Sequence, residues 1–395
     1  MVSHLLHIIV GCLMLPVNSL LLPFNVGTEL HGEHDSALRY LQESLQGRRE
    51  HLHELHPDIA NTQQKLGHIY CKRSEWDSAV DAYSDCLKIR EGNRASDMAS
   101  QILVADSLFD LGIALNKTLD TKRSMQLFND ALKEYQHHLS KYDLRVGRCY
   151  SIIGEVLEKE NNLPKAINSL RKAAAIYEYH LGVEPREKEI KTAKNSDDYT
   201  GQADTLFRLA TAHDRQGEES SALKLYRKAM KLYKAVFGRD SLHVAKVLNR
   251  LANMKGRAGS VDKAMVLFDE SLRIRMLHLG NNHEDVAETL FGMGIVFEKR
   301  RDYNAAMKAY SDCLRIRSSK FGSDSMEVAQ VVVNIGVVRG NKGDFPGALK
   351  SWKKALSIYR KQSLDDSDPL VATVIGHQNL ANTLMQNNTS KRKGR

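Results

Sequence analysis

The sequence is poor in the residues that form tight turns. Its 395 residues include only 7 prolines and 25 glycines, whereas a β-sandwich or barrel needs a turn about every 8 to 12 residues. We therefore expect a mostly helical chain. Hydrophobic residues make up 42% of the sequence and charged residues 27%, a composition that supports a buried core and excludes intrinsic disorder.

Cysteine is scarce, and the common catalytic motifs are missing. The five cysteines are widely spaced and include no C-x-x-C pair, so we interpret them as free thiols in a reducing compartment rather than as zinc or redox ligands. The sequence has no Gly-rich phosphate loop, no G-x-S-x-G elbow and no H-E-x-x-H motif. We expect no catalytic residues, no metal and no cofactor, and a protein that is not an enzyme.

The first 28 residues lack Lys, Arg, Asp and Glu altogether. Their apolar run is similar to a secretory signal with small residues for cleavage after Ser19, but no positively charged segment precedes it. Pro16 and Pro23 disfavour a membrane-spanning helix. Two interpretations of residues 1–28 stay open. A signal-like leader, with residues 1–19 cleaved, would send the protein to the secretory pathway or an organelle; a degenerate capping helix would belong to a cytoplasmic protein, which the free cysteines favour.

The excess of positive charge is concentrated at the C-terminus. The net charge is +9 at pH 7, and Lys391, Arg392, Lys393 and Arg395 supply four of these charges. The remaining excess is too small to indicate nucleic acid as the main partner. We expect residues 387–395 to form a basic, disordered tail.

The strongest signal in the sequence is an internal repeat. Residues 82–90 read AYSDCLKIR and residues 309–317 read AYSDCLRIR, which are identical at eight of nine positions. A small residue recurs through the chain, mostly at intervals of 42, and we call these seven residues the markers: Gly67, Gly112, Gly154, Ala210, Ala252, Gly294 and Gly336. Sixteen residues after each marker stands a large residue: Tyr83, Phe128, Leu170, Tyr226, Phe268, Tyr310 and Trp352.

Each repeat has the pattern of two amphipathic helices. In residues 286–321, apolar residues recur at helical spacing in a first stretch and again after a polar turn at residues 300–302. The small marker lets the two helix axes approach closely, and the large residue fills the space that remains. One such hairpin cannot bury its apolar stripe alone, so neighbouring hairpins must stack.

These features resemble the tetratricopeptide repeat, whose pattern appears here as Leu66-Gly67-x-x-Tyr70 followed by Ala79 and Tyr83. The period of 42 residues, in place of the usual 34, is similar to the long repeat of kinesin light chains and their relatives. The resemblance covers roughly residues 35–386. It implies an all-α fold, a right-handed α-solenoid of stacked helix-turn-helix repeats.

The repeat register predicts how the chain is organised. After the leader we expect a half repeat at residues 29–57 and then a solenoid at residues 58–386, with seven full repeats and a C-terminal capping helix. The apolar stripe of that capping helix would consist of His377, Leu380, Ala381 and Leu384. A charged insertion at residues 183–200 is expected to be a solvated loop or helix extension, with a regulatory or partner-binding role as the alternative.

A binding surface can be placed by numbering each first helix so that its marker is position 8. Positions 4, 7, 8 and 11 then form the core side. Positions 2, 5, 6, 9, 12 and 13 form the opposite side, which we call the groove face because it lines a concave groove in the resembling family. Its candidate binding residues are Phe207, Arg208, Arg215, Lys246, Asn249, Arg250, Arg257, Phe291, Asn334 and Asn379.

The chemistry of these residues favours a peptide ligand. On the groove face of the fourth and fifth repeats, the basic residues are opposed only by Asp204 and Asp214, and arginine binds carboxylates in bidentate fashion. The position-5 phenylalanines, which include Phe207 and Phe291, are expected to be exposed as apolar anchoring sites, and asparagine offers a donor and an acceptor to a peptide backbone. A merely solvated helix face is the alternative interpretation.

The resemblance implies a non-enzymatic protein-protein interaction adaptor. Its expected partners are other proteins that present acidic or aromatic-anchored peptide segments, with no small-molecule substrate, and with membrane contact only through the leader. Two alternative functions stay open: a helical-repeat RNA-binding protein that uses the same basic residues, and an accessory repeat module of a nucleotide-switched assembly.

Overall fold

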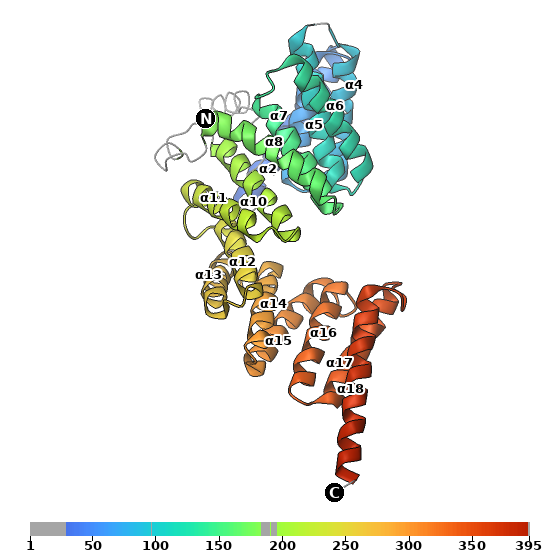
Figure 1. The fold of residues 1–395 in the computed structure, drawn as a ribbon. Helices are drawn as coiled ribbons and strands as arrows, with labels where there is room; N and C mark the ends of the chain where they lie inside the picture. The colour runs from blue at the N-terminus through green and yellow to red at the C-terminus, as the bar shows by residue number, and fades with distance from the viewer. Residues whose placement is uncertain (1–28, 96, 183–189, 191–195, 394–395) are drawn as a thin grey trace. The chain divides into compact units, whose positions relative to one another are not determined.

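The computed structural model describes residues 29–95, 97–182, 190 and 196–393, and the regular elements in these residues are all α-helices (Figure 1). This agrees with the all-α fold that the composition and the repeat predict. The leader at residues 1–28 and most of the charged insertion lie outside the described residues, and the last part of the insertion, from Ser196, belongs to a helix. The chain divides into two compact units, residues 1–236 and 237–395, and each is considered by itself.

Seven helix-turn-helix hairpins follow one another along the described chain. Their first helices are α3 (Pro57–Lys72), α5 (Met98–Lys117), α7 (Leu144–Lys159), α10 (Ser196–Arg215), α12 (Leu242–Arg257), α14 (Glu284–Lys299) and α16 (Met326–Asn341). Their second helices are α4 (Trp76–Gly92), α6 (Thr121–His138), α8 (Leu163–Leu181), α11 (Glu219–Phe237), α13 (Val261–Leu279), α15 (Tyr303–Phe321) and α17 (Phe345–Lys361). The tetratricopeptide-like solenoid of stacked hairpins is thereby confirmed.

The turn inside every hairpin has the same backbone conformation. One residue in each turn has a positive φ, and it lies seven residues after the marker: Ser74, Leu119, Asn161, Gly217, Gly259, Arg301 and Gly343. Glycine adopts this left-handed conformation freely, whereas a residue with a side chain pays roughly 1–2 kcal/mol for it. The hairpin therefore keeps a positive φ at this turn position even where the residue is not glycine.

The markers have the packing role that their spacing predicts. A Cβ atom on Gly67 would lie 2.5 Å from the ring of Tyr83, and a Cβ atom on Gly112 would lie 2.7 Å from the ring of Phe128. Both rings are completely buried. Only glycine permits this approach, so the hairpins close around a small residue on one helix and a large one on the other.

One helix stands at each end of the stack without a hairpin partner among the described residues. At the N-terminal end α2 (Glu29–His51) packs against α3, and at the C-terminal end α18 (Pro369–Lys393) packs against α17. In the alternation of the repeat, α2 has the place of a second helix and α18 that of a first helix.

Two features of α18 differ from the expectation. Its buried apolar residues are Val371, Val374 and Ala381, whereas Leu380 and Leu384 are exposed. The reason is that α18 keeps the 42-residue period, which makes Val374 the counterpart of the buried Val332. The helix also continues to Lys393, through residues expected to be disordered, because no proline or glycine interrupts this segment.

Among the described helices, α5 alone is long and apolar enough to cross a membrane by length and composition, and half of its most apolar window is buried within the protein. Its residues Leu111, Ala114 and Leu115 share a core cluster with Ala79 and Tyr83 of α4. The apolar character of α5 is thus accounted for by its place between neighbouring hairpins.

Candidate functional site

Position 5 of the groove face carries an aromatic pair that recurs in three hairpins. The ring centroids of Phe291 and Tyr310 lie 5.7 Å apart, and the same tilted pairing joins Phe207 to Tyr226 at 5.5 Å. The third pair is formed by Phe109 and Phe128. Position 5 therefore lies beside the large residue of the same hairpin's second helix, and its side chain helps to form the base of the groove face.

This geometry corrects the expectation that these phenylalanines are exposed. Phe207 is only 5% exposed, and Phe291 is partly buried. The guanidinium of Arg317 lies 5.1 Å from the ring centre of Phe291 and covers part of it. Phe207 is thus a core residue, because the helical wheel places position 5 away from the marker but does not show the neighbouring second helix.

A row of buried polar side chains beneath the groove face was not anticipated from the sequence. The residue 23 positions after each marker is a tyrosine or an arginine: Arg90, Tyr135, Tyr177, Tyr233, Arg275, Arg317 and Tyr359. The hydroxyls of Tyr135 and Tyr233 donate hydrogen bonds of 2.5 Å to Asp106 and Asp204, which occupy position 2 of their hairpins' first helices. Arg90 donates to Gln64 and Ser107, each at 2.8 Å.

These contacts link the second helices to the groove face. Burial, together with the nearby Asp106 carboxylate, raises the pKa of Tyr135, so its hydroxyl keeps its proton and donates. Burial raises the pKa of Asp106 above its usual value, and the hydrogen bond from Tyr135 opposes that rise. The sequence signal that could have revealed this row is the final arginine of the two near-identical phrases, Arg90 and Arg317.

In the first unit, the expected basic residues are paired with carboxylates of the preceding first helix. Arg208 lies 2.8 Å from Glu155 of α7, and Arg215 lies 3.6 Å from Glu158. Arg215 also donates to the Glu158 carbonyl oxygen at 2.9 Å. Burial raises the pKa of Glu155, but Arg208 and Lys159 outweigh it, so the pKa lies below its usual value.

This pairing corrects the charge estimate for that part of the groove face. Counting acids on the groove face of the same helices found only Asp204 and Asp214, but the opposing carboxylates, Glu155 and Glu158, come from the helix one repeat earlier. Arg208 and Arg215 therefore stabilise the stack, and their charges are already compensated.

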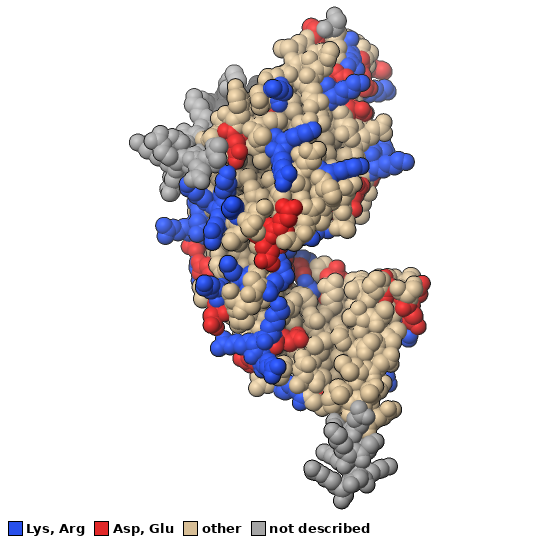
Figure 2. All heavy atoms as spheres, in the orientation of Figure 1, with Lys and Arg blue, Asp and Glu red and all other residues tan. Residues whose placement is uncertain are grey.

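In the second unit, α12 carries the basic part of the groove face. The helix contains no Asp or Glu, and Lys246 and Arg257 are exposed on it. Arg250 approaches Glu288 of α14 only to 3.8 Å, and the same carboxylate lies 3.0 Å from the buried Arg275. Arg250 is thus the weaker of two cationic partners of one carboxylate. Figure 2 shows charged side chains over α12 to α15 and few over α16 to α18.

Asn249 of α12 is the most unusual residue on this face. It occupies position 5, where three other hairpins have phenylalanine, and it is only 1% exposed. Neither its Nδ2 nor its Oδ1 atom has a hydrogen-bond partner among the described residues. An amide that is buried without partners costs roughly 1–3 kcal/mol.

The groove face becomes apolar along α14 and α16. Partly buried or exposed Phe291, Ile295, Val333 and Val337 stand there at positions 5 and 9. Asn334 is partly buried among them, and Asn379 is exposed on α18. Of the predicted residues, the second unit therefore brings Lys246, Asn249, Arg250 and Arg257 together on α12, next to an apolar strip with Phe291 and Asn334.

The described cysteines offer packing rather than reactivity. Cys71, Cys86, Cys149 and Cys313 are free and buried. Burial raises the pKa of the Cys71 thiol to about 11 and that of Cys313 to about 12, so neither is a thiolate nucleophile at neutral pH. No group of three or more His, Cys, Asp or Glu residues that could hold a metal ion occurs in the described part of the chain.

Family comparisons agree with the hairpin geometry. One tetratricopeptide repeat model matches residues 30–92 and 243–319, and a second tetratricopeptide repeat model matches residues 203–243. The chain is a tetratricopeptide repeat protein. Most of its repeats are 42 residues long. A comparison with curated proteins found no match.

Solved structures that are similar to this chain have low sequence identity to it. The apo form of the quorum sensor NprR from B. thuringiensis is 12% identical, with a TM-score of 0.53 over 84% of this chain and 98% of that one. Aspartyl phosphate phosphatase F from Bacillus subtilis is 14% identical, with a TM-score of 0.55 over 80% of this chain and 73% of that one. A Podosopora anserina putative kinesin light chain with nearly identical TPR-like repeats is 13% identical, with a TM-score of 0.42 over 55% and 97%.

Proposed function

We propose that this tetratricopeptide repeat protein is a non-enzymatic adaptor that binds an extended segment of a partner protein on the groove face of its second unit. The segment has acidic residues that lie along α12 and apolar residues that lie along α14 and α16. Tetratricopeptide repeats are generally interaction scaffolds, and the proposal extends that role to one surface and one ligand chemistry.

The unpaired amide of Asn249 carries this proposal. A peptide bond presents one N–H and one C=O, and an asparagine side chain can satisfy both at once. Burying this amide without partners destabilises the free protein, whereas a bound backbone would supply the missing partners. Because the phenylalanines at the equivalent position of three other hairpins pack without such a cost, the asparagine favours a polar ligand at this point of the face. A ligand would reach the 1% exposed amide only after the side chains that cover it move aside.

The surrounding residues specify the ligand further. Helix α12 supplies positive charge without acids of its own, which favours carboxylates on the peptide. The strip formed by Phe291, Ile295, Val333 and Val337 can bury an apolar anchor. The quorum sensor named above has a similar fold, but the ligand class inferred here comes from the residues of this chain.

The RNA-binding alternative is disfavoured by the charge pairing in the first unit. Arg208 and Arg215 are already compensated by Glu155 and Glu158, so they would have to leave these partners to contact phosphates. Binding of single-stranded RNA should weaken with salt at a log-log slope of roughly −0.7 per phosphate contact, which separates it from a peptide held by one or two ion pairs.

The test uses a short fluorescent peptide with an acidic half and an apolar half that contains Trp, titrated with the full chain. Arg250→Ala is expected to weaken binding about tenfold, which is the loss of one charge-assisted hydrogen bond. Asn249→Ala should also weaken it. Unchanged affinity in both variants would reject the proposed site.

A matched control comes from position 6 of the first unit. Arg208→Ala removes the same side chain from the equivalent position, but its carboxylate partner belongs to the stack. We expect this variant to lose stability and to keep its affinity for the peptide. A loss of affinity equal to that of Arg250→Ala would show that the ligand is not confined to the second unit.

A further inference from the structure

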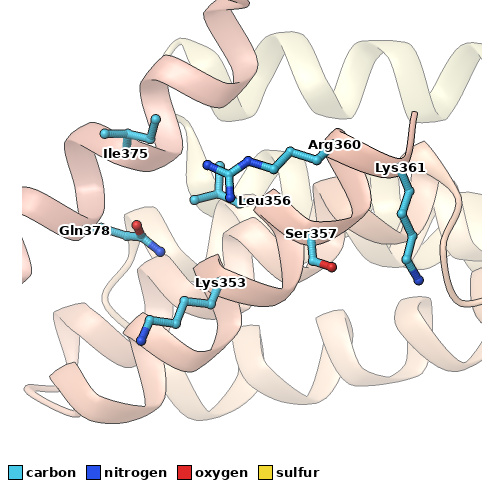
Figure 3. A pocket seen from close by; sticks show the side chains of 7 residues that line it. All are labelled: Lys353, Leu356, Ser357, Arg360, Lys361, Ile375 and Gln378. Atoms are coloured by element: carbon cyan, nitrogen blue, oxygen red, sulfur yellow. The ribbon is translucent and has the colours of Figure 1, made fainter. Parts of the chain in front are cut away.

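Among the described residues, no second helix follows α18 to complete a hairpin with it. By the 42-residue period, Ile375 and Gln378 of α18 stand at positions 5 and 8. In α14 the residues at these positions, Phe291 and Gly294, both lie against Tyr310 of the same hairpin's second helix. Beside α18, the corresponding space is a cavity of about 730 Å³ between α17 and α18 (Figure 3).

The lining of this cavity is suited to a helix with an acidic residue. From α17 it has Lys353, Leu356, Ser357, Arg360 and Lys361, and from α18 it has Ile375 and Gln378. The Nε2 atom of Gln378 is buried without a hydrogen-bond partner among the described residues. Arg360 lies 3.5 Å from Asp366 in an exposed pair, which contributes little to stability.

At the other end of the chain, α2 is a second helix whose own first helix is missing from the described residues. Its Ala37 and Ser44 lie 42 residues before Ala79 and Cys86. In the seven hairpins the residues at these two places are all completely buried. In α2, however, Ala37 is partly buried and Ser44 is exposed. Nothing in the described part of the chain therefore covers Ser44 on the face that every other second helix buries.

The two open faces differ from the ordinary hairpin in compensating ways. At position 8, where the seven hairpins have glycine or alanine, α18 has the larger Gln378. The residue sixteen positions after the marker, which contacts position 8, is aromatic in six of the seven hairpins. At the equivalent place α2 has the smaller Leu41. A larger residue on one helix would thus face a smaller one on the other, which partly offsets the added volume of the glutamine.

The charges at the two ends are also complementary. Consecutive second helices are joined by an ion pair in two places: Arg49 of α2 lies 3.1 Å from Asp85 of α4, and Glu178 of α8 lies 3.3 Å from Lys228 of α11. The later partner, Asp85 or Lys228, stands 18 residues after the marker of its hairpin. The earlier partner, Arg49 or Glu178, stands at the place that is 24 residues after the marker in a full hairpin.

The end helices carry opposite charges at the same two places. Arg360 of α17 stands 24 residues after Gly336, and it lines the cavity. Glu43 of α2 stands 42 residues before Asp85 and so occupies the place of the later partner. A second helix that entered the cavity in register would bring such a carboxylate to Arg360.

We propose that the cavity between α17 and α18 receives α2 of a second copy of this chain, so that α18 and α2 complete one hairpin between two molecules. The contact is head-to-tail, because one copy uses its C-terminal end and the other its N-terminal end. Such heterologous contacts extend into rings or open chains of copies. The surface is separate from the groove face of α12 to α16, and the inference does not depend on the peptide ligand.

The experiment measures the molar mass of the full chain as a function of concentration by sedimentation velocity. The unaltered protein should show species larger than the monomer that grow with concentration. Ser44→Trp places a ring where all counterparts are small and buried, and overpacking of about 1–3 kcal/mol weakens association at least about fivefold. Because Ser44 is exposed in the single chain, this variant should keep its thermal stability.

A charge exchange identifies the register. Glu43→Arg alone and Arg360→Glu alone should each weaken association, and the double variant should restore it, because the pair is re-formed with the charges exchanged. Lys308→Glu, on the exposed side of α15, is the control for a change of net charge and should leave association unchanged. A protein that stays monomeric at all concentrations, association that survives Ser44→Trp, or a double variant no better than the single ones would overturn the proposal.

Discussion

Replacing Asn249 by leucine separates the requirements of binding from those of stability. Leucine has the same number and branching of side-chain heavy atoms as asparagine, but it brings no polar group into the core. Asn249 is 1% exposed, and neither amide atom has a partner among the described residues. The substitution should therefore remove a penalty of roughly 1–3 kcal/mol and stabilise the free protein, while it abolishes the hydrogen bonds that a peptide backbone would receive.

The expected size of this effect follows from the size of the second unit, residues 237–395. For domains of this length, 1 kcal/mol corresponds to about 2–4 °C in Tm, so Asn249→Leu should raise the Tm by roughly 2–12 °C. The assay combines thermal melting by circular dichroism with titration of the acidic-apolar peptide. Because repeat stacks can unfold in stages, hydrogen exchange of the α12 amides provides a local measure of the same gain.

The control for Asn249→Leu is the same substitution at an exposed asparagine. Asn304→Leu changes an exposed asparagine at the start of α15 that accepts a hydrogen bond from Lys342, so it should give no gain in stability and no loss of affinity. If Asn249→Leu lowered the Tm, or left peptide affinity unchanged, the amide would have a structural role and the reasoning from its unpaired atoms would fail.

Three further predictions follow from the packing, the turns and the buried carboxylates. Ala306→Leu should overpack the completely buried contact between α14 and α15 and cost about 1–3 kcal/mol; urea unfolding measures this cost, and an unchanged midpoint would contradict the repeat register. Leu119→Gly should stabilise the first unit by up to about 1 kcal/mol, because Leu119 is exposed with φ +67 and glycine removes the steric cost; a lower Tm would show that chain entropy outweighs the strain. Asp106→Asn should stabilise the protein increasingly as the pH rises above about 4, because the raised pKa of Asp106 means that the folded state holds a proton which the unfolded state releases near that pH. Urea unfolding of both proteins between pH 4 and pH 8 checks this, and a difference that does not depend on pH would contradict it. The Tyr135 hydroxyl can still donate to the asparagine oxygen.

The features of the fold that the sequence predicts are those that depend on short separations along the chain. Gly67 and Tyr83 are sixteen residues apart, and their contact requires only that two helices fold back on each other. The same holds for the turn residue seven positions after each marker, such as Leu119 or Gly259. A period repeated seven times makes such local rules visible, because chance substitutions do not obscure all copies.

The features that the sequence did not predict depend on neighbours from other helices. Arg208 and Glu155 are 53 residues apart and lie on different helices, so a helical wheel for α10 cannot show their contact. Phe207 lies on the groove face of that wheel, and yet Tyr226 of the next helix buries it. The wheel gives the direction of a side chain from its own axis, whereas burial depends on what stands in that direction.

The same distinction explains why the arginines at position 6 of the two units differ in their ion pairs. In the first unit, acids on α7 meet the arginines of α10, and each pair joins adjacent repeats and consumes the charge that a ligand would need. In the second unit, Glu288 has the buried Arg275 at 3.0 Å, and Arg250 is left at 3.8 Å from the same carboxylate. One acid then serves two cations, so the charge of Arg250 is only partly compensated within the stack. A solenoid that uses one face both for holding its repeats together and for binding partners offers a ligand the charges whose internal pairing is incomplete, and Arg250 of α12 meets that condition.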